Sequence, residues 1–202
     1  MRNFRRLPWA LAILLAIPAP LSAQPVVSKT YSYFWIGGKT AEDLDSELER
    51  HGPLTKTTGS RHPGATEIKF GGEISYLEKD GRCSIASARV TLRTHIILPR
   101  WRNRGAASGT LAMIWDALSA DIKRHEERHA EIARGHARNL ESRLTSLRPA
   151  RNCDMLEKRV NEISRKAIEE HDSDQLRFDT TESANFDSRI MRILKNRTRA
   201  GE

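Results

Sequence analysis

Apolar residues recur at helical spacing through the second half of this 202-residue chain. Between residues 109 and 147 one such stripe is joined by three histidines, and its members follow one another at intervals of three, four or seven. They are Leu111, Trp115, Leu118, Ile122, His125, His129, Ile132, His136, Leu140 and Leu144. This periodicity predicts one amphipathic helix of almost forty residues with its histidines on the inward face.

A second stripe of the same kind follows a break at Pro149 and Asn152. It contains Leu156, Val160, Ile163, Ala167, Glu170 or His171, Asp174 and Phe178. Because the connection is short, we expect the two helices to pack antiparallel to each other. With the chain reversing near residue 150, His129 should lie level with residue 171 and His125 level with residue 175.

The first half has the patterns of strands and one short helix. Residues 30–38 are aromatic and β-branched, and residues 88–98 alternate up to Pro99, which predicts a strand in each segment. Residues 66–70 and 73–77 are two further candidates, flanking Gly71-Gly72 as a hairpin turn or bulge.

A short helix should begin after Thr40, an N-cap residue with Asp43 three positions on, and should stop at Gly52-Pro53. Together these patterns predict an α+β fold. We expect a small antiparallel sheet with a short helix, followed by two long antiparallel helices.

The N-terminal residues predict export from the cytoplasm. Three arginines precede the apolar run 9–17, and small residues follow at 21–23, as in a secretory signal peptide cleaved near Ala23. The apolar run is too short for a membrane-spanning helix, so we expect no stable membrane span after cleavage. The domain plan is a signal peptide at 1–23, one folded domain at 24–187 and a basic end at 188–202.

Two cysteines remain after that cleavage, Cys83 and Cys153. An even number in an exported protein predicts one disulfide between them. It would join a strand region to the segment between the two long helices. Two metal-binding cysteines are the alternative, which the spacing does not favour because no CxxC-type pair is present.

The formal charge is +8, and it falls to +5 when Arg2, Arg5 and Arg6 leave with the signal segment. The remaining basic residues are spread along helices and are not interleaved with aromatic residues, so nucleic-acid binding is not indicated. A solvated helical surface explains these charges, with contact to an anionic surface as the alternative.

Residues 125–129, His-Glu-Glu-Arg-His, carry the clearest chemical signal of the chain. On a helix, residues four apart share a face, so both imidazoles can reach one Zn²⁺. The glutamate that follows the first histidine can reach a metal-bound water, as in the zincin motif HExxH. The sequence therefore predicts His125 and His129 as zinc ligands and Glu126 as the catalytic base. Histidines satisfied by hydrogen bonds in a helix interface are the alternative.

A catalytic zinc usually has three protein ligands, so a third must come from outside residues 125–129. Glu170, His171 and Asp174 lie on or beside the inward stripe of the second helix, at the level expected for the motif, and each is a candidate. His136 is a weaker one, because seven residues of unbroken helix place it about 10.5 Å from His129 along the axis.

The chain resembles a bacterial family known as domain of unknown function 922, whose members are described as secreted zinc-dependent proteases. The resemblance covers roughly residues 31–186 and is carried by 33–40 (YFWIGGKT), 51–53 (HGP), Cys83, 98–101 (LPRW), Trp115 and the HExxH residues. It implies the zincin-like roles of His125, Glu126 and His129. Members of the family carry Tyr-Asp, then Thr and His-Gly, on the last helix, whereas the comparable stretch 178–185 (FDTTESAN) has no histidine.

These observations predict a periplasmic or secreted zinc metallopeptidase that hydrolyses peptide bonds of a peptide or protein substrate in the bacterial envelope. By analogy with zincins, residues 88–98 could form an edge strand that pairs with an extended substrate. One alternative is a non-catalytic periplasmic helical binding module, with or without a structural metal. Another is a protein that stores or delivers metal.

Overall fold

The computed structural model describes residues 24–55 and 59–200. The predicted signal segment lies outside these residues. The elements are β1 (Val26–Ile36), α1 (Ala41–His51), β2 (Ala65–Lys79), β3 (Arg82–Trp101), a 3₁₀ turn η1 (Arg104–Ala106), α2 (Gly109–Thr145), α3 (Cys153–Ala184) and α4 (Phe186–Ala200). The predicted α+β fold is confirmed. Among the described residues, we find no helix with the length and apolar character needed to cross a membrane.

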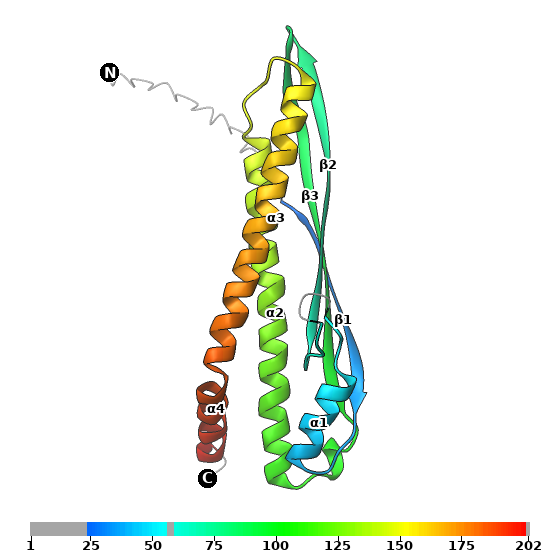
Figure 1. The fold of residues 1–202 in the computed structure, drawn as a ribbon, viewed down its shortest axis with the longest axis vertical. Helices are drawn as coiled ribbons and strands as arrows, with labels where there is room; N and C mark the ends of the chain where they lie inside the picture. Colours follow the sequence, from blue (N-terminus) through cyan, green and yellow to red (C-terminus); the bar gives the residue numbers. More distant parts are fainter. Residues whose placement is uncertain (1–23, 56–58, 201–202) are drawn as a thin grey trace, which may run out of the picture.

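A long, narrow sheet lies along the helices, with the strand order β1-β3-β2 (Figure 1). β2 and β3 form an antiparallel hairpin, as expected from their short connection. β1 pairs with β3 in parallel, so the sheet is mixed and not wholly antiparallel. The chain between β1 and β3 passes through α1 and the whole of β2, which lets β1 run in the same direction as β3. β3 is therefore the central strand, and the expectation that residues 88–98 form a substrate-binding edge is wrong.

The hairpin turn lies at Asp80–Gly81 and not at Gly71–Gly72. Asp80 and Gly81 have φ values of 53° and 69°, the left-handed conformation that a tight hairpin turn requires. β2 continues through Gly71 and Gly72, and the irregularity in its pairing occurs between Ser75 and Tyr76. A Cβ atom on Gly72 would lie 2.6 Å from the carbonyl oxygen of Arg89, so close strand contact explains this glycine. β3 also runs past Pro99 to Trp101.

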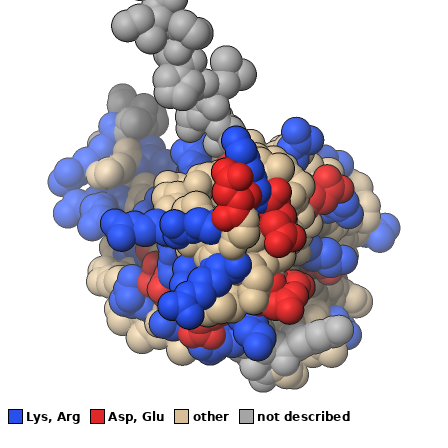
Figure 2. All heavy atoms as spheres, turned by 90° about the horizontal axis from the view of Figure 1, so that it is seen from above, with Lys and Arg blue, Asp and Glu red and all other residues tan. Residues whose placement is uncertain are grey.

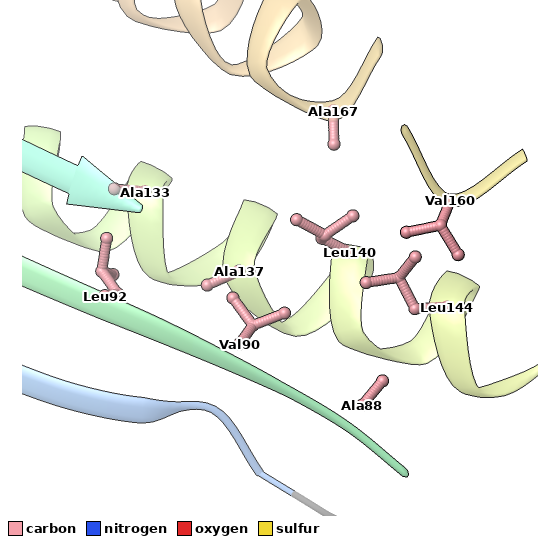
Figure 3. Close-up of a cluster of buried hydrophobic side chains, with 9 residues drawn as sticks. All are labelled: Ala88, Val90, Leu92, Ala133, Ala137, Leu140, Leu144, Val160 and Ala167. Carbon is pink, nitrogen blue, oxygen red and sulfur yellow. The ribbon is translucent and has the colours of Figure 1, made fainter. Parts of the chain in front are cut away.

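The main core fills the space between β3, α2 and α3 (Figure 3). Every second residue of β3 points towards the helices, and these side chains meet small and branched residues of α2 and α3. The cluster comprises Ala88, Val90, Leu92, Ala133, Ala137, Leu140, Leu144, Val160 and Ala167. The alanines of α2 allow the helix to approach the sheet closely, which places the long helix directly over the central strand.

The connection between α2 and α3 is fastened to β3. Ala150 forms an antiparallel bridge with Cys83, with N···O distances of 2.8 and 3.0 Å. The predicted disulfide is confirmed: Cys83 is bonded to Cys153, the first residue of α3. α3 consequently begins beyond the end of α2, near the tip of the β2–β3 hairpin (Figure 1).

This displacement changes the register of the helix pair. Gln175, and not residue 171, lies against His129, with Oε1 2.6 Å from Nδ1. The expected register was wrong by about one helical turn, because the connection first carries Ala150 to a bridge with β3 and α3 begins only at Cys153. The position of every α3 side chain opposite α2 follows from this shift.

α4 continues from α3 after Asn185 and runs towards the N-terminal end of α2 (Figure 1). It contains most of the basic C-terminal residues. Seen from the hairpin end of the molecule, lysine and arginine side chains are distributed around the surface with acidic side chains between them (Figure 2). On this face the two charge signs are mixed.

Candidate metal centre

The HExxH residues occupy the middle of α2, where the helix faces both the sheet and α3. Ile122 and Ala130 pack with Ile96 and Leu98 of β3. His125 and His129 point instead towards α3, where the Phe178 ring lies 4.9 Å and 5.1 Å from their ring centroids. Glu126 points towards the sheet and reaches Thr66 in β2. One helix thus presents its two imidazoles to one neighbour and its carboxylate to another.

Asp179 of α3 completes a cluster with the two histidines. Its Oδ1 lies 3.0 Å from His129 Nε2 and 3.3 Å from His125 Nε2. The two Nε2 atoms are 3.0 Å from each other. Although about half of the Asp179 side chain is exposed, Oδ1 is buried and makes no hydrogen bond of good geometry to any residue that the structure describes. Three electron-pair donors therefore converge on one point.

The spacing of these donor atoms fits a zinc ion. Ligand atoms at about 2.0–2.1 Å from a tetrahedral Zn²⁺ are separated by about 3.3 Å, close to the separations measured here. Two imidazoles and a carboxylate are also a donor set that zinc accepts. The orphaned oxygen of Asp179 further agrees with a cation, because a buried carboxylate oxygen without a partner is costly.

The charges of this cluster depend on one another. Burial by itself would raise the pKa of Asp179, but the close approach of His125 and His129 holds that pKa well below its ordinary value. Burial would likewise lower the pKa of His129, but Asp179 and Gln175 outweigh it and raise that pKa. The cluster thus keeps Asp179 ionised and favours positive charge beside it.

Gln175 determines which nitrogen of His129 faces the cluster. Its Oε1 lies 2.6 Å from Nδ1 of His129, and its Nε2 donates to the carbonyl oxygen of the same residue at 3.1 Å. Because an amide oxygen only accepts, Nδ1 must carry the proton. The lone pair of Nε2 on a neutral His129 is then directed at Asp179 and His125.

A buried histidine supports Gln175 from the other side. Nε2 of His171 lies 2.8 Å from Nε2 of Gln175, and its Nδ1 lies 2.9 Å from Oδ1 of Asp172. Burial lowers the pKa of His171 despite the nearby Asp172. A neutral His171 with its proton on Nδ1 accepts from the Gln175 amide and donates to Asp172. Three side chains in a row, Asp172, His171 and Gln175, therefore fix the orientation of His129.

Glu126 is almost fully buried, with 6 % of its surface exposed. Thr66 Oγ1 donates to its Oε2 at 2.8 Å, and also lies 2.9 Å from its carbonyl oxygen. Gly64 packs so closely that an added Cβ would lie 3.0 Å from Glu126 Cγ. Burial raises the pKa of Glu126, while the neighbouring His129 and the Thr66 hydroxyl act in the opposite direction. A buried carboxyl group held by one hydroxyl donor beside two imidazoles can accept a proton and return it.

The structure brings together His125, Glu126 and His129, but it places the three candidates for a third ligand elsewhere. Glu170 is paired with Arg143, and Asp174 with His136 and Arg177. His171 supports Gln175 as described above. Asp179 takes the expected place of a third ligand, one helical turn beyond Gln175. The signal for it was the Phe178-Asp179 pair in the family-like stretch 178–185, and the misplaced register directed attention one turn too early.

A pocket of about 360 Å³ opens beside His125 and Glu126, within the size range of ligand sites. Its lining comes from three parts of the chain: residues 62–63 before β2, residues 121–126 of α2, and the junction of α3 and α4. The sequence reading did not find this pocket. Its walls are brought together only by the tertiary fold, and no local pattern joins residue 63 to residue 186.

A family model matches most of this chain. The model of a family described as bacterial proteins of unknown function, DUF922, matches residues 31–186. The matched segment includes the second half of β1 and all of α1, β2, β3, α2 and α3, and hence all the residues of the cluster and Glu126. Searches of curated proteins and of solved structures gave no match.

Proposed function

We propose that this chain, which belongs to the DUF922 family of bacterial proteins, is a zinc-dependent metallopeptidase. His125, His129 and Asp179 would hold the metal, and Glu126 would act as general base. The observation that carries this proposal is the convergence of two Nε2 atoms and one carboxylate oxygen, 3.0–3.3 Å apart, beside a buried glutamate. Peptide bonds are the natural substrate class for an HExxH helix with this arrangement.

The protein's residues would divide the work of hydrolysis among them. A bound zinc supplies a Lewis acid that polarises a carbonyl group and lowers the pKa of water towards about 7. Glu126 would take the proton of the attacking water and pass it to the leaving amine. Thr66 holds the Glu126 carboxylate at 2.8 Å, and Gln175 holds the His129 ring at 2.6 Å. Both groups are thus oriented before substrate arrives.

The number of protein ligands favours catalysis over a purely structural metal. Structural zinc sites use four protein ligands, whereas catalytic sites use three and leave one position for water or substrate. The cluster contains three donor residues, and the pocket next to it is lined by His125 and Glu126. A closed structural site would have no need of an adjoining pocket or of a buried Glu126.

We place this activity in the periplasm or outside the cell. The signal-like residues 1–23 support export. The disulfide between Cys83 and Cys153 supports an oxidising compartment. The substrate would then be a peptide or protein of the bacterial envelope.

The first test is the metal content of the purified protein, measured by elemental mass spectrometry after stripping and reloading with zinc. We expect one zinc per chain, lost in Asp179→Ala. Asp174→Ala is the matched control, because Asp174 lies on the same helix and pairs with His136, outside the cluster. Equal zinc content in all three proteins would exclude Asp179 as a ligand, and no zinc in the unaltered protein would exclude the metal site.

The second test is hydrolysis of a peptide mixture by the zinc-loaded protein, followed by mass spectrometry of the products. Glu126→Gln should retain zinc and lose cleavage. A protein that binds zinc but cleaves nothing in either form would instead be the non-catalytic binding module.

A further inference from the structure

The pocket beside His125 and Glu126 has a charged wall that is neutral as a whole. Arg189 of α4 places Nε 2.9 Å and Nη2 3.1 Å from the two carboxylate oxygens of Asp121. Its Nη2 also lies 3.3 Å from Oε2 of Glu182. Arg124 pairs with the same two carboxylates, with Nε 2.9 Å from Asp121 Oδ1. Asp121, Glu182 and Arg189 line the pocket, and Arg124, outside the lining, supplies the second cation that balances the two carboxylates.

Besides this wall, the pocket is lined by His125 and Glu126, by His62 and Ser183, and by three apolar side chains. Pro63 comes from the segment before β2, Ile122 from α2 and Phe186 from the first residue of α4. A charged ligand group entering here would lose hydration and find every neighbouring carboxylate and guanidinium of the wall already paired. An apolar group would lose nothing by entering and would cover the surfaces of Pro63, Ile122 and Phe186.

We infer that this pocket is the subsite for a large, uncharged apolar side chain of the substrate, such as leucine, methionine or phenylalanine. The inference rests on the proposed peptidase function. Because His125 and Glu126 line the same pocket, the side chain it accepts must belong to a residue next to the bond that is cleaved. The pocket would set specificity and would also align the peptide with Glu126.

α4 contributes the wall that most directly determines this preference. Phe186 is the last residue of the family match, and Arg189 lies beyond it. The bond between Arg189 and Asp121 fastens α4 to α2 and so fixes the position of Phe186. Phe186 is 39 % exposed, so its side chain can be exchanged without disturbing the main core.

The test uses four peptide-like hydroxamates that differ only in the side chain that follows the chelating group: isobutyl, benzyl, carboxyethyl and aminobutyl. Their affinities for the zinc-loaded protein are measured by calorimetry. We expect the isobutyl and benzyl compounds to bind about 10–100-fold more tightly than the two charged ones. Equal affinities, or a preference for a charged side chain, would overturn the inference.

Two variants that introduce opposite charges at Phe186 separate a change in specificity from general damage to the fold. Phe186→Lys should improve binding of the carboxyethyl compound relative to isobutyl by about 10-fold, and Phe186→Glu should do the same for the aminobutyl compound. Unfolding cannot produce these opposite changes. Met191→Lys, on the same helix but outside the pocket and 66 % exposed, should leave the order unchanged. If both variants lose the preference for isobutyl but neither gains affinity for the compound of opposite charge, then Phe186 does not determine the preference.

A second set of probes separates this inference from the metal proposal. Acetyl-Ala-X-Ala-amides, with X as Leu, Phe, Glu or Lys, carry no chelating group and can be titrated by NMR into metal-stripped protein. The Leu and Phe peptides should shift the Ile122 methyl signals and the charged ones should not. This order must hold whether or not the protein binds zinc. If it fails while zinc binds normally, the subsite is wrong and the metal centre is unaffected.

Discussion

The two ends of the helix pair formed by α2 and α3 differ in the side chains that they bury. At the end near the hairpin tip, Leu140, Leu144 and Val160 pack on β3, and the disulfide fastens α3 to the sheet. Towards the other end, the same two helices bury His129, Glu126 and Asp121 against polar partners. We refer to these regions as the disulfide end and the site end.

The difference shows how one pair of helices can separate stability from chemistry. Apolar burial needs no particular partner, and so packing stabilises most of the disulfide end, where the buried Glu141 carboxylate accepts from the backbone N–H of Val90 at 2.7 Å. Each buried polar group of the site end needs a correctly placed partner, and without one it destabilises the fold. We therefore expect changes at the disulfide end to alter stability and changes at the site end to alter metal binding and activity.

The largest expected effect is at Glu126. Glu126→Gln keeps the shape of the side chain and an oxygen that can accept from Thr66, but it cannot take up a proton. We expect kcat/KM for peptide hydrolysis to fall by about 10²–10⁴-fold, while thermal unfolding changes little. If Glu126→Gln lowers the thermal unfolding temperature as well as the activity, then the site end also determines stability, which contradicts the separation of the two ends. Glu127→Gln, on the next residue and hydrogen-bonded to Tyr31, is the matched control and should retain activity.

The next effect is at the disulfide. Replacing both Cys83 and Cys153 by alanine should lower the free energy of unfolding by about 4 kcal/mol, because the crosslink closes a loop of 70 residues. Chemical denaturation measures this loss. Zinc affinity should remain unchanged, since Asp179 lies about 39 Å along α3 from Cys153. A parallel loss of zinc would show that the register fixed at the disulfide end is transmitted to the metal centre.

The features that the sequence predicted are local ones, which depend on residues close together in the chain. The short helix with its Thr40 cap and the two long helices depend on neighbouring residues, and the structure agrees with them. Thr40 accepts from the backbone of Asp43, whose carboxylate accepts from the backbone N–H of Thr40 in return. Helical periodicity also predicted that His125 and His129 lie on the inward face of their helix, and in the structure this face meets α3.

The features that the sequence did not predict all depend on contacts between distant segments. The direction of β1 relative to β3 depends on how the chain returns after α1 and β2. The position of Asp179 depends on the bridge between Ala150 and Cys83, which moves α3 by one turn. The pocket requires Pro63, Ile122 and Phe186 to meet. The periodicity of the sequence carries no information about contacts between distant segments. The candidates for a third ligand that it indicated on α3 therefore lie one or two turns before Asp179.

A smaller effect is expected at Gln175, which orients His129 without touching the proposed metal position. Gln175→Ala removes the acceptor for the His129 Nδ1 proton and should weaken zinc binding by about 10–100-fold. Competition with a chromophoric chelator measures this change. Leu176→Ala is the control, because Leu176 is 67 % exposed on the same helix. Equal affinity in both variants would mean that packing alone orients His129.

The smallest effect concerns the charges that hold α4 at the site end. Burial by itself would raise the pKa of Asp121, but Arg189 and Arg124 outweigh it and lower that pKa. A lowered pKa stabilises the fold above the ordinary carboxyl value of about 3.9 and loses that contribution as the pH falls further. Between pH 5 and pH 3 the unaltered protein should therefore lose on the order of 1 kcal/mol more stability than Asp121→Asn, as measured by denaturation.

Asp116 provides the comparison that decides whether burial matters for this effect. Its pKa is also lowered, because its carboxylate accepts hydrogen bonds from Arg104, but its side chain is 41 % exposed whereas that of Asp121 is 4 % exposed. Solvent screening should make the pH-dependent loss attributable to Asp116 smaller than that of Asp121. If Asp116→Asn and Asp121→Asn change the pH dependence equally, then charge pairing alone stabilises this end. A larger effect at Asp121 would show that the site end relies on buried ion pairs, as the disulfide end relies on buried apolar residues.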